Sequence, residues 1–129
     1  MGRYMDVLRT FLLLGAAFLF IGPAIGMCMG GSGDHSLAAS HAHINLVGFV
    51  LSSIFALAYG TLSDMGESRL SALHFWFHLV GAIGLNLTLF LLVSQRISEA
   101  AMTQAAPPAE ALVLVGALLF LVNAWHNAR

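Results

Sequence analysis

Four long apolar segments constrain this chain more than any other feature of its sequence. Their approximate bounds are 7–28, 38–60, 70–94 and 108–125. Crossing the hydrocarbon core of a bilayer takes about 20 apolar residues, so each segment is long enough to span it as a helix. Pro23 lies inside the first segment, where neighbouring helices can satisfy the backbone group that it frees. The sequence therefore predicts an all-α membrane protein, with one domain of four transmembrane helices over residues 1–129.

The composition supports this prediction. Hydrophobic residues make up 59% of the 129 residues and charged residues only 9%, against about 45–50% and about 25% in soluble domains. So few charges cannot cover a soluble surface, whereas lipid accepts apolar side chains that face outward. A net charge of −1 without a basic run argues against nucleic-acid binding. Cys28 is the single cysteine, so the chain cannot form an internal disulfide.

Arginines indicate an orientation for the four spans. Arg3, Arg9, Arg69 and Arg129 fall on one side of the membrane, and Arg96 falls on the other. Because cytoplasmic segments carry an excess of basic residues, we expect both termini in the cytoplasm. We also expect the first apolar segment to be retained as a helix and not removed as a signal peptide.

Polar connections and small residues predict where the spans end and where two helices pack closely. The segments 30–34, 61–69 and 95–108 separate the spans, and the two prolines that end the last connection suit the start of a helix. Gly22, Gly26 and Gly30 recur every four residues, a spacing that lets helices approach closely in lipid. The alternative is that small residues are simply common in such helices.

Histidines are the candidates for chemistry. The chain has six, and ionisable groups inside a membrane are costly and often functional. Imidazole is also the commonest metal ligand and a frequent haem ligand. His41 and His43 open the second span. A helix turns about 100° per residue, so the two rings point about 200° apart and cannot ligate one iron from a single helix. Each serves a different site, or the same kind of site in a neighbouring subunit; the alternative is hydrogen bonding to another helix.

A second pair, His74 and His78, lies in the third span. The spacing of four places both rings on one helical face, where they could share a second metal ion. His78 could instead ligate haem. The remaining interpretation is structural hydrogen bonding, with the aromatic residues 75–77 forming part of an interfacial belt.

Other polar and sulfur-bearing residues are weaker candidates for a functional site. His35 and His126 are expected in solvated or interfacial positions. Met27, Cys28 and Met29 offer soft ligands that suit copper, but such a run is more typical of packing. The sequence contains no glycine-rich phosphate loop, nucleophile elbow or paired intramembrane carboxylates, which argues against a proton-coupled transporter or channel.

Residues 34–96 resemble helices ten and eleven of the catalytic subunit of haem-copper oxidases. In that family the tenth helix carries a His-x-His pair, which ligates the low-spin haem with one histidine and the high-spin haem with the other. Here the pair is His41-Ala42-His43. The family also has an aspartate seven residues before the pair, near the haem propionates. Asp34 occupies that position.

The resemblance extends through the eleventh helix. The family has a His-Phe-Trp motif, a glycine seven residues after that histidine, and an Asn-Leu-Thr triplet. Here these are residues 74–76, Gly81 and 86–88, with the triplet displaced by three positions. Arg96 falls where the family has propionate-binding arginines, and a guanidinium suits that pairing. The chain is also similar to small stand-alone four-helix relatives with a His-Ala-His-Ile/Leu-Asn-Leu segment.

The resemblance carries expectations for assembly. The family's catalytic subunit has twelve helices in three arcs of four, so three copies of this chain would rebuild it as a homotrimer; a dimer is the alternative. His41 of one subunit and His43 of its neighbour could then hold one haem from opposite faces. The His-Pro-Glu-Val-Tyr segment, His-His pair and active-site tyrosine of the family's copper site are missing, so neither copper nor oxygen reduction is expected.

Three functions remain open. The first is a b-type haem protein of a prokaryotic inner membrane, which transfers electrons through bis-histidine haem b to or from a quinol or another cytochrome. The second is sensing or binding of nitric oxide, oxygen or haem, which needs an open axial position. The third is a non-haem structural or assembly protein with histidines that join helices. Whether the chain is an enzyme stays open, because His74 and His78 could still form a metal site.

Overall fold

The computed structural model describes residues 6–128, and every regular element in that range is helical. The elements are α1 (Val7–Ser32), α2 (Ala38–His43), the π-helix η1 (Ile44–Val50), α3 (Leu51–Thr61), α4 (Ser63–Glu67), α5 (Arg69–Val93) and α6 (Glu99–Asn127). Four helices are long and apolar enough to cross a membrane: α1, the continuous second span α2–η1–α3, α5 and α6. The predicted all-α architecture with four such helices is confirmed.

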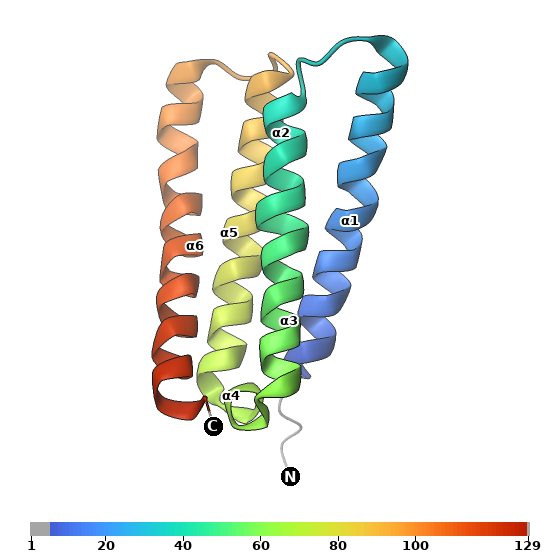
Figure 1. The fold of residues 1–129 in the computed structure, drawn as a ribbon. Helices are drawn as coiled ribbons and strands as arrows, with labels where there is room; N and C mark the ends of the chain where they lie inside the picture. Colours follow the sequence, from blue (N-terminus) through green and yellow to red (C-terminus); the bar gives the residue numbers. More distant parts are fainter. Residues whose placement is uncertain (1–5, 129) are drawn as a thin grey trace.

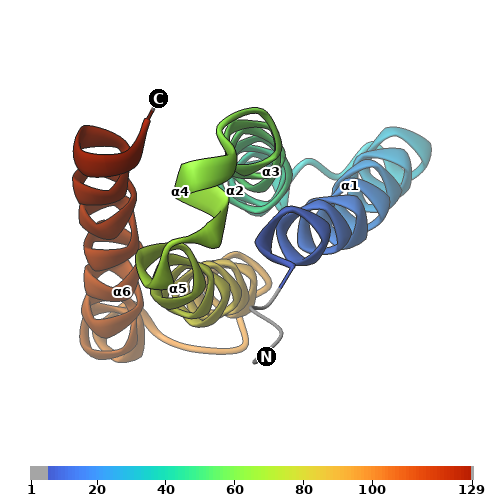
Figure 2. The ribbon, with the colours of Figure 1, turned by 90° about the horizontal axis from the view of Figure 1, so that it is seen from below.

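The four long helices form an open row and not a closed ring. α5 packs along α6, and the second span packs along α1, with smaller contacts joining the two pairs. α1 and α6 therefore lie at opposite sides of the row (Figure 2). The connections 33–37 and 94–98 lie at one end, called the loop end, and Asp6, α4 and Ala128 lie at the other, called the terminal end (Figure 1).

Capping residues set the ends of α1. The Asp6 side chain accepts a hydrogen bond from the backbone N–H of Arg9 at 3.0 Å, which satisfies one of the free donors of the first turn. The helix continues past the expected end at Cys28 to Ser32. It stops at Gly33, whose positive φ of 71° and N–H bond to the Met29 carbonyl form a left-handed cap.

The last helix also differs from its expected bounds. α6 begins at Glu99 and not at Pro108, because the Ser98 hydroxyl accepts a hydrogen bond from the backbone N–H of Ala101 and caps the first turn. Pro107 and Pro108 therefore lie inside the helix.

The π-helix η1 interrupts the second span directly after His43. Its wider turns bond residue i to residue i+5, as the backbone N–H of Leu51 does to the carbonyl of Leu46. The side chains of α3 are therefore rotated away from the register that an uninterrupted α-helix would give them. Within η1, Gly48 lies so close to α1 that a Cβ atom there would overlap the ring of Phe18.

Side chains divide between a buried cluster and an apolar outer surface. The cluster near the terminal end comprises Val7, Phe11, Phe55, Ala56, Tyr59, Met65 and Phe75. Large apolar side chains point outward along the spans, including Phe20, Leu57, Leu114 and Trp125. A soluble monomer rarely exposes so much contiguous apolar surface. The four spans and this surface characterise an integral membrane protein.

Replacing Gly48 with alanine tests the close contact between η1 and α1. We expect a loss of about 1–3 kcal/mol in the free energy of unfolding, because the added methyl group displaces Phe18. Gly31→Ala is the matched control, since no atom lies within 4 Å of a Cβ there. Unfolding by SDS titration in mixed micelles measures both variants. Equal stabilities for the two variants would contradict the packing described here.

Candidate functional site

His41 lies at the loop end of the second span and packs against α1. Its Nδ1 atom is 2.8 Å from the carbonyl oxygen of Gly22. A carbonyl only accepts, so Nδ1 carries the proton and donates it. The neutral imidazole then keeps its lone pair on Nε2, the form in which histidine binds a metal. A backbone carbonyl on Nδ1 is also a usual partner behind a metal-bound histidine, where it fixes the ring orientation.

Two of the three evenly spaced glycines provide the surface on which this ring rests. A Cβ atom at Gly26 would lie 3.0 Å from Cε1 of His41, and one at Gly22 would overlap the side chain of Asn45. The predicted close packing is therefore confirmed for these two glycines. It is wrong for Gly30, which has no neighbour within 4 Å of a Cβ because it lies near the exposed end of α1.

Asn45 adds a second polar contact to His41. Its Nδ2 atom donates to the His41 carbonyl oxygen at 2.9 Å and lies 3.3 Å from each ring nitrogen. Because Nδ1 is itself a donor, only Nε2 can accept from this amide. An iron ion on Nε2 would replace that long contact and leave the shorter bond to the carbonyl intact.

His43 has the same protonation pattern on an exposed face. Its Nδ1 atom is 3.2 Å from the carbonyl oxygen of Ala39, one helical turn earlier, so this ring also donates from Nδ1. The side chain is exposed, whereas His41 is half-buried against α1. Within residues 6–128, no group of three or more His, Cys, Asp or Glu side chains could hold a metal ion. Because residues two apart on a helix point in nearly opposite directions, His41 and His43 of one chain cannot both reach the same iron.

Asp34 lies in the loop between α1 and α2, at the same end as this histidine pair. Its carboxylate accepts a hydrogen bond from the backbone N–H of Ser36 at 2.9 Å. That bond lowers the pKa of Asp34 below its ordinary value, so the exposed side chain is charged at neutral pH.

Arg96 also lies at the loop end, where α5 terminates. Gln95 adopts a positive φ of 59°, and the backbone N–H of Arg96 donates to the carbonyl of Leu91 at 2.8 Å. Its side chain is exposed. A cavity of about 540 Å³ lies between the two connections, lined by Ser36, Gln95 and Ile97 among others. The predicted propionate-binding residues thus lie at the same end as His41 and His43.

His74 and His78 have a different environment, deep between α5 and the second span. Their exposed fractions are 0% and 1%. The Tyr59 hydroxyl is 2.8 Å from Nδ1 of His74, and the Ser52 hydroxyl is 3.2 Å from Nε2 of His78. These hydroxyl groups were missed in the sequence, although polar residues in an apolar span were the available signal. The contacts favour the interpretation that this pair joins helices.

The aromatic surroundings support this interpretation. The rings of His74 and His78 lie 6.0 Å apart between centroids, and Phe11, Phe55 and Phe120 pack against them. Nε2 of His74 is buried without a hydrogen-bond partner, but no third ligand accompanies it within the described residues. A second metal at this pair stays an untested prediction.

The remaining candidates differ in how exposed their side chains are. His35 and His126 are exposed, as expected for solvated or interfacial positions. Met27 and Cys28 are exposed while Met29 is buried, so the three side chains do not face one direction. This arrangement favours packing over copper binding.

Comparisons with known protein families, curated proteins and solved structures gave no match to this chain. The candidate site at the loop end therefore rests on its own residues and geometry.

Removing the Tyr59 hydroxyl tests the role of the buried pair. We expect Tyr59→Phe to lower the free energy of unfolding by about 1 kcal/mol, because it leaves Nδ1 of His74 without its partner. Thr61→Ala is the control, since that hydroxyl bonds only within its own helix. SDS titration gives the stabilities, and elemental analysis gives the metal content. A metal ion lost from Tyr59→Phe with unchanged stability would contradict a structural role.

Proposed function

We propose that this chain is a b-type haem protein of the membrane, in which His41 and His43 are axial ligands to haem b. The observation that carries the proposal is their shared protonation pattern. Each ring donates from Nδ1 to a backbone carbonyl, which leaves Nε2 as the potential iron ligand. Neutral imidazoles held in this way fit the donor set of a bis-histidine haem.

The two ligands of one haem would come from neighbouring chains. Rings about 200° apart on one helix cannot reach the same iron, and the exposed His43 is accessible to a partner. We infer a homotrimer, in which three open rows of four helices close into a ring of twelve. Each interface would then pair His41 of one chain with His43 of the next. A dimer is the alternative arrangement.

Electron transfer is the activity that such a haem supports. Two axial histidines leave no open position on the iron for a substrate or gas. The protein's contribution is to hold both imidazoles and to balance charge at the loop end. There Arg96 would pair with the propionates and offset their repulsion by the charged Asp34. The redox partner is a quinol or another cytochrome.

The orientation follows from the arginines. Arg9 and Arg69 lie at the terminal end and Arg96 at the loop end, whereas Arg3 and Arg129 fall outside the described residues. The positive-inside rule then places the termini in the cytoplasm and the haem near the outer side of a prokaryotic inner membrane.

One contact favours a second candidate function. The Asn45 amide lies 3.3 Å from Nε2 of His41. If this contact persists when haem is bound, only His43 ligates the iron and the other axial position stays open. The protein would then bind or sense a gas such as nitric oxide or oxygen. A non-haem structural protein is the third reading, and it predicts a colourless preparation.

Absorption spectra of the purified protein test the proposal. We expect sharp α and β bands after dithionite reduction and a Soret band that carbon monoxide does not shift, because the iron is six-coordinate. His41→Ala and His43→Ala should each lose these bands, whereas the exposed His35→Ala and His126→Ala should keep them. A carbon monoxide shift would favour gas binding. A wild type that remains colourless after haem is supplied would overturn the proposal.

Arg96→Gln tests the propionate contact. We expect faster haem loss to apomyoglobin, by about 5-fold to 30-fold, because one charge-assisted hydrogen bond contributes about 1–2 kcal/mol. Arg69→Gln, at the terminal end, should release haem at the wild-type rate. Identical rates for Arg96→Gln and wild type would show that the guanidinium does not contact haem.

A further inference from the structure

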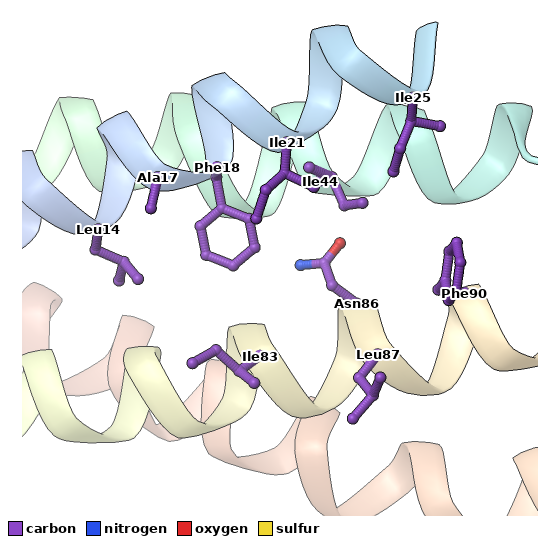
Figure 3. Close-up of a pocket in the computed structure, with 10 residues that line it drawn as sticks. All are labelled: Leu14, Ala17, Phe18, Ile21, Ile25, Ile44, Ile83, Asn86, Leu87 and Phe90. Atoms are coloured by element: carbon purple, nitrogen blue, oxygen red, sulfur yellow. The ribbon is translucent and has the colours of Figure 1, made fainter. Parts of the chain in front are cut away.

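A groove of about 480 Å³ lies between α1, η1 and α5 (Figure 3). It occupies the half of the spans toward the loop end, and its residues include Phe18, Ile21, Ile44, Ile83, Asn86 and Phe90. Every residue that lines it is apolar except Asn86. An occupant must therefore present an apolar body to almost the whole wall and a polar group to one side chain.

Asn86 presents an unpaired acceptor within this groove. The side chain is 4% exposed, and its Nδ2 atom donates to the Ala82 carbonyl at 2.8 Å, which fixes the orientation of the amide. Its Oδ1 atom is buried and has no hydrogen-bond partner. Figure 3 shows the amide reaching from α5 toward α1, between Phe18 and Phe90. A buried acceptor without a donor is costly in hydrocarbon, so a ligand that donates a hydrogen bond to Oδ1 would be favoured at this position.

The chemistry of the wall favours a donor with an apolar, aromatic body. Acyl chains of lipids carry no hydrogen-bond donor, and a quinone offers only carbonyl acceptors. A quinol has an apolar body, a hydroxyl donor and an aromatic ring, which can pack against Phe18 or Phe90 in the usual offset or edge-on geometry. We propose that this groove binds a quinol from the lipid phase, with one hydroxyl donating to Oδ1 of Asn86.

The groove adjoins the proposed haem ligand. Ile44 follows His41 by three residues on the second span, and Ile25 of the groove wall neighbours Gly26, which contacts the His41 ring. As an electron donor the quinol rests on the haem function proposed above. Oxidation of one quinol to its quinone releases two electrons and the two hydroxyl protons; haem held by His41 and His43 would supply the electron acceptor, with one electron for each of two haems.

Binding of the two redox forms tests the site. Decyl-ubiquinol and decyl-ubiquinone are each equilibrated with the purified protein in detergent under nitrogen, and equilibrium dialysis gives the affinities. We expect the quinol to bind about tenfold more tightly than the quinone, because only the quinol satisfies Asn86. Asn86→Leu should remove this preference. Leu73→Ala, an exposed position of α5 outside the groove, should retain it.

A second variant covers the case in which Asn86→Leu does not fold. Ile83→Trp fills the groove while leaving Asn86 in place, and it should prevent binding of both forms. Equal affinities for quinol and quinone in the wild type, or competition by decanol at the same concentration, would overturn the proposal in favour of unspecific lipid binding. Dialysis does not depend on haem bands. Absent quinol binding in a coloured protein refutes only this site, whereas a colourless protein refutes the haem function.

Discussion

The hydrogen bond from Nδ1 of His41 to the Gly22 carbonyl joins the fold to the proposed chemistry. It links α1 to the second span at 2.8 Å and determines which ring nitrogen keeps a lone pair. The contact exists only because Gly22 and Gly26 let the two helices approach closely. A larger residue at Gly26 would push the imidazole away from α1, and one at Gly22 would displace the neighbouring Asn45 side chain.

The two histidine pairs differ in their hydrogen-bond partners and in their exposure. His74 and His78 are enclosed by aromatic rings and bonded to hydroxyl groups of α3, so they stabilise the contact between helices. His41 and His43 have backbone partners on Nδ1 only, apart from the long contact with Asn45. The open row of helices leaves the exposed His43 accessible to a neighbouring chain, where a shared cofactor would complete the assembly.

Hydropathy and helical periodicity predicted the four spans and the opposite directions of His41 and His43, because both depend on local spacing. They did not predict η1, since apolar composition does not reveal a change from i→i+4 to i→i+5 hydrogen bonding. The start of α6 was missed because the two prolines were interpreted as a helix start, whereas the helix begins after the Ser98 cap and contains them. The bonds of Tyr59 and Ser52 to the buried histidines are contacts between distant segments, which no local pattern contains.

Co-expression of His41→Ala and His43→Ala chains tests most directly whether each haem is shared between subunits. An interface regains both ligands when an intact His41 from one variant meets an intact His43 from the other. In a randomly mixed trimer about a quarter of the interfaces should do so, whereas every interface of either variant alone lacks one of the two ligands. Reduced haem bands at about that level are the result we predict. A mixed preparation as colourless as the separate variants, with native mass spectrometry confirming mixed trimers, would contradict the shared-haem account.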